Sequence, residues 1–291
     1  MHQSLIILAV LGWPLCAACG ACPSQPELLQ RWFDAVGEAQ PDEDFGHLLT
    51  RATQAQLGAP YRFAQGDTEA PRCDLASFNC VTLVESALAV ARCLWIREPT
   101  GGCFADELTN IRYRDGEEAG EATRLYYLSD WLEDVERRGL AVSLTAALGG
   151  RAVQQRFFHL TQAAQARPTL ADAAVLDAVS HTEVELSARR HWLLPREQIK
   201  ASLPQLRDGD IIAIDRHIPG LLGGHRGIVT HDARGRVQLL HASSRQGRVV
   251  MTRVDLAAYV ERFVRSRGIV VARPLPPRPG DAWRRAQTRR P

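Results

Sequence analysis

The sequence predicts an α+β fold in which helices come first and a small antiparallel sheet follows. Amphipathic helical stripes dominate the chain before residue 204. After it come short β-branched runs separated by turn residues, a pattern typical of strands joined by hairpins. This separation of helices from strands along the chain favours an α+β domain over an alternating α/β one.

The composition is that of an ordinary globular protein with a sizeable core. The 291 residues are 45% hydrophobic and 23% charged, enough for one large domain or two small ones. A formal net charge of +2 gives no reason to expect a nucleic-acid partner. We expect a folded domain over residues 26–273. A disordered tail is expected over residues 274–291, which are rich in Pro and Arg and lack periodicity.

The N-terminus has the features of a secretory signal. An apolar run from Leu5 to Leu15 is too short to cross a bilayer, and small residues and cysteines follow it. We therefore expect residues 1–22 to be a signal peptide or a lipoprotein signal, and the protein to be exported to the periplasm or cell envelope. Acylation of Cys19 or Cys22 would supply a lipid anchor. No other stretch is apolar enough to be a membrane span.

Helical patterns begin after the signal. Residues 26–58 carry an apolar stripe at helical spacing, and residues 59–79 are loop-like, with prolines and mixed polarity. The stretch 77–96 then predicts a helix, with Asn79 or Ser77 as its N-cap. Its stripe is formed by Val81, Val84, Leu88, Ala91 and Trp95.

Further helices are predicted before the sheet. The helix that begins near residue 80 is expected to end around Pro99. A second amphipathic helix is predicted over residues 122–138, with Gly139 as its C-terminal stop. Residues 150–190 are predicted to be mainly helical, although their period is less clear.

Strand-like runs follow Pro204. They are DIIAID, GHRGIVTHD, RVQLLHASS, GRVVMTRV and RGIVVARPL. Ala233, Arg234 and Gly235 separate the second run from the third, and a three-residue loop with Gly in its last position is a common hairpin connection. We therefore expect residues that are equally distant from Arg234 to face each other across this hairpin.

Cys80 is a candidate nucleophile. A cysteine attacks as the thiolate, and a thiol pKa falls at a helix N-terminus and beside a histidine. The backbone N–H of Cys80 would be a free donor of the first turn, and such a donor can serve an oxyanion hole. The alternative is that Cys80 is a small buried hydrophobe, which is the more common role of a cysteine near a helix start.

The predicted hairpin supplies a base for this nucleophile. His225 and His241 would lie on the same side of the hairpin, one diagonal step apart. His225 is the candidate base, and His241 would fix the orientation of its ring, as in a nucleophile–base–orienter triad. The glycines around His225 leave room for a substrate backbone.

The other histidines leave two further interpretations open. His217 and His231 are expected to be half-exposed and solvated. All four histidines together could hold zinc. However, His217, His225, His231 and His241 follow one another at intervals of 8, 6 and 10 residues, which match no standard ligand motif. We expect no metal and no cofactor.

Export would place the remaining thiols in an oxidising compartment. They are Cys73, Cys80, Cys93 and Cys103. Cys93 and Cys103 flank the loop WIREPTGG and could form a disulfide, which would leave Cys73 over and Cys80 free.

Six stretches follow one another along the chain in a specific order. They are FNCVTLVESALAVAR, RLYYLSDWLEDVERRGL, FFHL, LPQLRDGDIIAI, GHRGIV and LLHASSRQGRVVM. Together they resemble the bacterial N-acetylmuramoyl-L-alanine amidase-like family, one of the NlpC-type, papain-like cysteine hydrolases of the cell wall. The resemblance runs from about residue 45 to residue 273.

The resemblance implies a papain-like, NlpC-type core. In such a core a nucleophile-bearing helix packs on a small antiparallel sheet, and additional helices shape the substrate groove. It implies Cys80, His225 and His241 as the catalytic residues, and cleavage of amide bonds in peptidoglycan without a metal or cofactor. One position departs from the family, which usually has Asp directly before the nucleophile. Asn79 can cap the helix there but carries no charge.

Five residues are candidates for substrate contact. They are Asn79, Tyr126, Ser129, Asp130 and Trp131. The last four belong to the second of the similar stretches, and a Tyr/Ser/Asp/Trp group suits a sugar–peptide ligand. The alternative is that Tyr127 and Trp131 anchor their helix in the core and that Asp130 is solvated.

The sequence therefore predicts an exported cysteine amidase that acts on peptidoglycan or muropeptides. The expected bond is that of N-acetylmuramoyl-L-alanine. A stem-peptide endopeptidase of the same superfamily and a non-catalytic wall-binding module are the alternatives.

Overall fold

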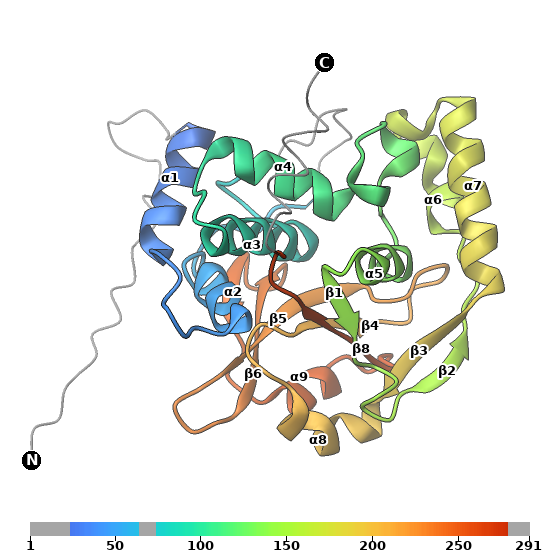
Figure 1. The fold of residues 1–291 in the computed structure, drawn as a ribbon. Helices are drawn as coiled ribbons and strands as arrows, with labels where there is room; N and C mark the ends of the chain where they lie inside the picture. Colours follow the sequence, from blue (N-terminus) through green and yellow to red (C-terminus); the bar gives the residue numbers. More distant parts are fainter. Residues whose placement is uncertain (1–23, 64–73, 279–291) are drawn as a thin grey trace, which may run out of the picture.

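An antiparallel sheet organises the fold, and helices lie on both of its faces (Figure 1). The computed structural model describes residues 24–63 and 74–278. Within them the strands follow the order β2-β3-β8-β4-β5-β6-β7, and β1 pairs with β8. The strands are β1 (Ala141–Ser143), β2 (Arg151–Gln154), β3 (Arg190–Pro195), β4 (Ile211–Asp215), β5 (His225–His231), β6 (Val237–Ser243), β7 (Arg248–Met251) and β8 (Gly268–Pro274). This arrangement confirms the predicted α+β combination.

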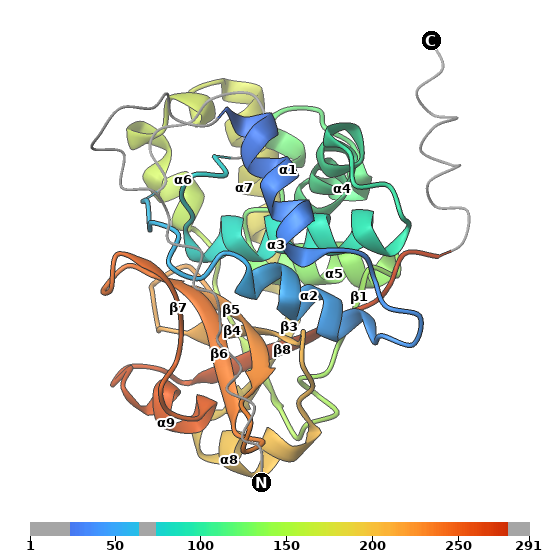
Figure 2. The same ribbon diagram turned by 90° about the vertical axis from the view of Figure 1, so that its left-hand side faces the viewer.

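The helices form a thick layer on one face of the sheet and a thin layer on the other (Figure 2). They are α1 (Gln25–Val36), α2 (Phe45–Gln54), α3 (Cys80–Trp95), α4 (Gly101–Arg112), α5 (Leu128–Arg137), α6 (His159–Ala163), α7 (Ala173–Ala188), α8 (Ile199–Ser202) and α9 (Leu256–Glu261). The helices α1 to α5 share a core with Ile211 and Ile228, whereas α8 and α9 share one with Ile212 and Val229. Strands that are buried on both faces read as continuous apolar runs, which is why β4 to β6 stand out in the sequence.

The predicted helical stretch 26–58 consists of two helices. Gly37, with a φ of 69°, ends α1 in a conformation that favours glycine. The carboxylate of Asp44 then accepts the N–H of Gly46 and caps α2. The predicted signal over residues 1–22 and the thiol of Cys73 lie outside the described residues.

Helix α3 begins at Cys80 and is the central helix of the thick layer. The stripe residues Val84, Leu88 and Ala91 are buried, as predicted, and so is nearly every other residue from Leu83 to Leu94. The helix ends at Trp95, earlier than the predicted end near Pro99. The hydroxyl of Thr100 accepts the N–H of Cys103 and starts α4, a helix that the sequence analysis did not predict.

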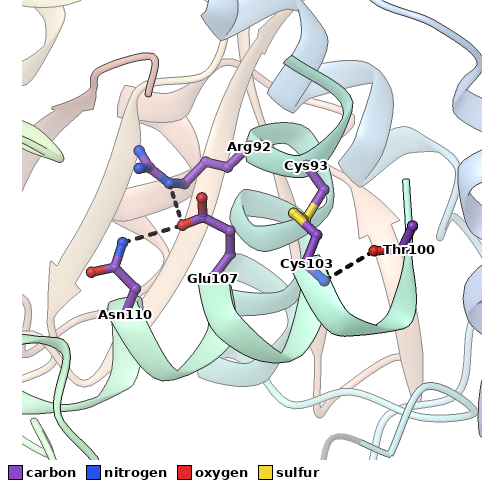
Figure 3. The surroundings of a disulfide bond; sticks show 6 residues. All are labelled: Arg92, Cys93, Thr100, Cys103, Glu107 and Asn110. Carbon is purple, nitrogen blue, oxygen red and sulfur yellow. Dashed lines mark hydrogen bonds and ion pairs between the residues drawn. A yellow bond between two sulfur atoms is a disulfide. The ribbon is translucent and has the colours of Figure 1, made fainter. Parts of the chain in front are cut away.

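A disulfide joins the end of α3 to the start of α4 (Figure 3). Cys93 and Cys103 are ten residues apart in sequence, with Cα atoms 5.9 Å apart, and they form the bond that the sequence left possible. Beside it, the guanidinium of Arg92 donates to the carboxylate of Glu107 at 2.8 Å, and both side chains are buried. A second buried ion pair joins Arg112 of α4 to Glu85 of α3, so one covalent bond and two buried ion pairs hold the two helices together.

The predicted helix over residues 122–138 is shorter than expected. Helix α5 begins only at Leu128, because the preceding segment is held in an extended form. Arg124 forms an isolated β-bridge with Tyr113, and the N–H of Leu125 donates to the carbonyl of Arg112. Gly139, with a φ of 73°, follows the helix as the predicted stop.

Residues 150–190 contain a strand as well as helices. The strand β2 pairs with β3 at the edge of the sheet, so the mainly helical prediction is wrong for residues 151–154. The remainder holds α6, short 3₁₀ turns and the long helix α7.

The central hairpin has the predicted register. Ile228 faces Leu240 and His231 faces Val237, so residues equally distant from Arg234 are paired. Gly235 has a φ of 72° in the turn, a left-handed conformation that favours glycine in the last position of such a loop. The strand β8 ends at Pro274, the first residue of the predicted tail, and residues from 279 on lie outside the described part. Among the described helices none is long and apolar enough to cross a membrane.

Candidate active site

Cys80 is the first residue of α3, and Asn79 is the cap of that helix. The Asn79 side-chain oxygen accepts the N–H groups of Val81 and Thr82, each at 2.9 Å. The hydroxyl of Thr82 accepts the N–H of Asn79 in return, at 3.0 Å, which completes a capping box. Cys80 is partly exposed and unpaired, the only free cysteine among the described residues. The cap leaves the N–H of Cys80 at the exposed start of the helix.

The hairpin brings His225 and His241 into direct contact. His225 Nε2 and His241 Nδ1 are 2.9 Å apart, a hydrogen-bond distance, and the two rings are nearly perpendicular at 87°. His225 is 9% exposed and His241 is 1% exposed. The diagonal neighbours expected from the turn are therefore bonded to each other in a nearly closed environment.

Burial keeps both imidazoles neutral. Loss of solvation, followed by smaller contributions from His241 and Arg216, lowers the pKa of His225 to about 3. Loss of solvation likewise lowers the pKa of His241 to about 4. At neutral pH each ring then carries one N–H and one free lone pair, so one ring donates to the other. A neutral His225 can accept a proton.

Helix α9 and the β4–β5 connection surround this pair. The ring of Tyr259 lies 5.1 Å from the ring of His241, and that of Phe263 lies 6.2 Å from the ring of His225. The guanidinium of Arg216 lies over Phe263 at 5.3 Å. The sequence analysis missed α9. Two signals for it were available in the sequence. Asp255 caps the helix, and the aromatic residues Tyr259 and Phe263 of the stretch YVERF lie four positions apart.

Electrostatic interactions link Cys80 to the histidine side of the site. Burial raises the pKa of Tyr259 to about 12, and a negative charge on Cys80 also raises it. Burial raises the pKa of Tyr61 as well, again with a contribution from Cys80. Tyr259 also contacts the ring of His241. Both tyrosines stay protonated at neutral pH and can donate hydrogen bonds.

Two of the predicted substrate residues are structural. Asp130 is buried, and its two oxygens each accept a hydrogen bond from Arg114 at 2.8 Å. Trp131 is 2% exposed, and its indole N–H donates to the carbonyl of Ile111. Both side chains hold α5 against its neighbours, and a substrate role for them stays a prediction. The sequence analysis named the core role of Trp131 as the alternative.

The other predicted substrate residues remain accessible. Tyr126 is half-buried, with Arg124 and Arg167 near its ring at 5.4 and 5.8 Å. Ser129 lines an open cavity of about 340 Å³ between α5 and β3. Asn79 is engaged as a cap through its oxygen, as described above. A substrate role for these three residues stays a prediction.

The other two histidines do not join the pair. His231 Nδ1 lies 2.6 Å from the carboxylate of Asp208, and His217 is exposed. The described residues contain no group of three or more His, Cys, Asp or Glu side chains that could hold a metal ion.

Comparisons with known proteins agree with this description. The profile of a family described as N-acetylmuramoyl-L-alanine amidase-like matches residues 52–268. Two crystal structures of an N-acetylmuramoyl-L-alanine amidase from Bacteroides uniformis are 29% and 30% identical to this chain. Each match covers 79% of this chain and has a TM-score of 0.73. The matches cover 98% and 99% of the Bacteroides uniformis chains. A Bacteroides fragilis structure provisionally named a xylanase is 32% identical, covers 76% of this chain and 98% of its own, and has a TM-score of 0.70. No curated protein matches the chain.

Proposed function

The chain belongs to the N-acetylmuramoyl-L-alanine amidase-like family, and from this we propose that it hydrolyses an amide bond in peptidoglycan or muropeptides. The proposed bond joins N-acetylmuramic acid to L-alanine, the bond named in the family's description. The observation that carries a cysteine mechanism is the bonded pair of His225 and His241, with a free, capped Cys80 in the same electrostatic environment. This combination supports an NlpC-type, papain-like core.

In the proposed mechanism, Cys80 is the nucleophile and His225 is the base. His225 takes the thiol proton, and the thiolate sulfur attacks the carbonyl carbon of the amide. The tetrahedral intermediate collapses when the amide C–N bond breaks, and His225 returns the proton to the leaving amine. Water, activated by His225, then cleaves the thioester and restores the thiol. His241 holds the ring of His225 through the 2.9 Å hydrogen bond.

We propose two donors for the oxyanion. The N–H of Cys80 belongs to the first turn of α3, where backbone N–H groups have no partner within the helix. The phenol of Tyr61 stays protonated because burial and the charge of Cys80 raise its pKa. Both donors are available in the neutral-pH form of the site, and a negative oxygen that develops near the sulfur would bond with them.

We further propose that the protein is exported. The Cys93–Cys103 disulfide supports this, because disulfides persist in oxidising compartments. The signal is proposed to be residues 1–22, as a signal peptide or a lipoprotein signal, and the catalytic domain to be residues 26–273.

Mass spectrometry of a defined muropeptide tests the function. We expect the wild type to release free N-acetylmuramic acid and an intact stem peptide. Cys80→Ala should abolish the reaction, because no other described thiol is free. His217→Ala is the matched control, since His217 is exposed and lies outside the pair, and it should retain full activity.

Other products would identify other functions. Cleavage inside the stem peptide indicates an endopeptidase, and binding without cleavage by the wild type indicates a wall-binding module. Hydrolysis of a glycosidic bond would contradict the proposal, as would activity that a chelator abolishes and iodoacetamide does not.

A further inference from the structure

An exposed cation lies at the edge of the histidine pair. Ile214 of β4 faces His225 of β5, and Arg216 follows two residues later, a spacing that places it on the same face of the sheet. The guanidinium of Arg216 lies 5.3 Å from the ring of Phe263, and that ring lies 6.2 Å from the ring of His225. One aromatic side chain thus lies beside both Arg216 and the proposed base.

The backbone on either side of Arg216 is held in place. The buried carboxylate of Asp215 accepts hydrogen bonds from the guanidinium of Arg267 and, at 3.3 Å, from the N–H of His217. A Cβ atom on Gly224, directly before β5, would lie 3.4 Å from the Cβ of Arg216. The connection between β4 and β5 therefore fixes where the side chain of Arg216 begins, against the start of β5.

The guanidinium of Arg216 has unused hydrogen-bond donors. Among residues 24–63 and 74–278 no carboxylate forms an ion pair with it and no hydrogen bond holds it. The neighbouring carboxylate of Asp215 is already paired with Arg267. Arg216 is exposed, so an anion from solution can reach it. A guanidinium that rests on an aromatic ring keeps its planar fork of N–H groups, which matches a carboxylate.

Electrostatic interactions agree with this placement. Burial raises the pKa values of Tyr61 and Tyr259, and the charge of Arg216 acts on both in the opposite direction. A negative charge on Cys80 raises the same two pKa values. The charge of Arg216 therefore acts within the proposed site, in addition to its contact with Phe263.

The proposed mechanism defines which part of the substrate passes Arg216. The acyl carbon bonds to the sulfur of Cys80, whereas the leaving amine takes its proton from His225 and so lies within hydrogen-bond reach of that ring. In the proposed reaction this amine is the N-terminus of the stem peptide, which therefore extends from the side of the site where Arg216 lies. The first carboxylate along that peptide belongs to its second residue, a D-glutamate that continues the chain through its side chain and keeps its α-carboxylate free.

We infer that Arg216 binds the free α-carboxylate of the second stem residue and so makes the protein selective for acidic stem peptides. The inference rests on the proposed function, because it takes the stem peptide as the leaving group. Arg216 acts on binding and does not touch the reacting atoms, so it is a specificity residue. A stem peptide in which this carboxylate is amidated offers a neutral carboxamide, which cannot accept two charge-assisted hydrogen bonds from a guanidinium.

Two muropeptides that differ only in this group test the inference. One carries the free α-carboxylate on its second stem residue, and the other carries the carboxamide. We expect the wild type to hydrolyse the acid with a kcat/KM about tenfold higher, mainly through KM, because the carboxylate lies away from the scissile bond. Arg216→Met should lose this preference. Arg216→Lys keeps the charge without the planar fork and should retain part of it.

Arg234→Met is the matched control. Arg234 is exposed in the turn of the β5–β6 hairpin, at the opposite end of β5 from His225. The same charge is removed there, so the preference for the acid should be unchanged. A preference that both Met variants lose equally would reflect the net charge of the protein and would overturn the inference. A preference that Arg216→Met retains would also overturn it, as would a wild type that hydrolyses both muropeptides equally well.

Failure of the proposed function gives a different result. Calorimetric binding of the same two muropeptides to Cys80→Ala, with and without Arg216→Met, requires no turnover. If the wild type hydrolyses neither muropeptide, the proposed function is wrong, and the binding data decide the inference. Binding of the acid about tenfold tighter than the carboxamide, with the difference abolished by Arg216→Met, would support it. Equal affinities for the two muropeptides in Cys80→Ala would overturn it.

Discussion

The neutral state of His225 and His241 ties the stability of the protein to pH. Each has a folded-state pKa far below the ordinary value of 6.5, about 3 for His225 and about 4 for His241. Between pH 6.5 and these values the unfolded chain binds protons that the folded chain does not. The stabilisation is therefore complete above pH 6.5 and is lost progressively as the pH falls toward 4 and below.

This dependence predicts a specific slope. Below pH 6.5 the free energy of unfolding should fall by about 1 kcal/mol per pH unit for each histidine. Urea unfolding at pH 7 and pH 5 measures it. The double variant His225→Asn, His241→Asn should have a clearly shallower slope, and His217→Asn, which changes an exposed ring, should keep the wild-type slope. Equal slopes in the wild type and the double variant would contradict the burial of neutral rings.

Individual residues also show what sequence patterns reveal. Asn79 or Ser77 was predicted as a cap because capping depends on residues close in sequence, and in the structure Asn79 is the cap. The burial of Asp130 against Arg114 was not predicted, because the two residues are sixteen positions apart and meet only when α5 packs on the preceding loop. The ion pair of Arg112 with Glu85 likewise joins residues 27 positions apart and depends on how α4 packs on α3. Local contacts, including the histidine pair of one hairpin, were therefore predictable, and contacts that depend on how separate elements pack were not.

The covalent link between α3 and α4 is the main constraint at the level of elements. Helix α4 carries Glu107 and Arg112, whose ion pairs with α3 are buried, so its position affects both the core and the charge at Glu85. Replacing both Cys93 and Cys103 with Ser should lower the free energy of unfolding by about 3 kcal/mol, because the unfolded chain loses a short closed loop.

Urea unfolding with and without a reducing agent measures this effect. The reducing agent should lower the stability of the wild type to that of the double variant and leave the variant unchanged. If the oxidised wild type and the double variant were equally stable, the disulfide would contribute nothing to the free energy of unfolding, and this prediction would be wrong.

The elements that were predicted correctly share strong local patterns. The hairpin β5–β6 has long apolar runs and a glycine turn, so its register followed from the sequence. By contrast β1 has three residues and α9 has six, too few to show a period. The extended segment before α5 depends on a bridge between Arg124 and Tyr113, a contact that helical spacing does not encode.

At the scale of the whole molecule, the helical layer meets the sheet through a contact that only glycines permit. A Cβ atom on Gly46 of α2 would lie 2.1 Å from the carbonyl oxygen of Asp208. A Cβ atom on Gly209, which has a φ of 85°, would lie 2.4 Å from the Cα of Gly46. Nearby, the hydroxyl of Thr50 donates to the carbonyl of Val229 in β5. The position of α2 on the sheet thus requires glycine, which has no side chain, at both residue 46 and residue 209.

Gly46→Ala should therefore destabilise the whole domain. The extra methyl group meets a backbone carbonyl that cannot rotate away, so we expect a loss of about 1–3 kcal/mol or more in the free energy of unfolding. Gly101→Ala is the matched control, because a Cβ atom there meets nothing within 4 Å. It should change stability by less than about 0.5 kcal/mol. Equal effects of the two substitutions in thermal or urea unfolding would contradict the described contact.

The register of the β5–β6 hairpin also restricts how this protein can diverge. His225 and His241 lie sixteen positions apart, and their contact depends on that interval through the pairing of the two strands. A codon gained or lost within the interval would shift the pairing and turn one ring away from the other. A codon gained or lost between α3 and β4 leaves the interval intact, since it changes only the chain that connects the nucleophile to the hairpin. We therefore expect length variation over generations to be tolerated in the helical connections and selected against between the two histidines.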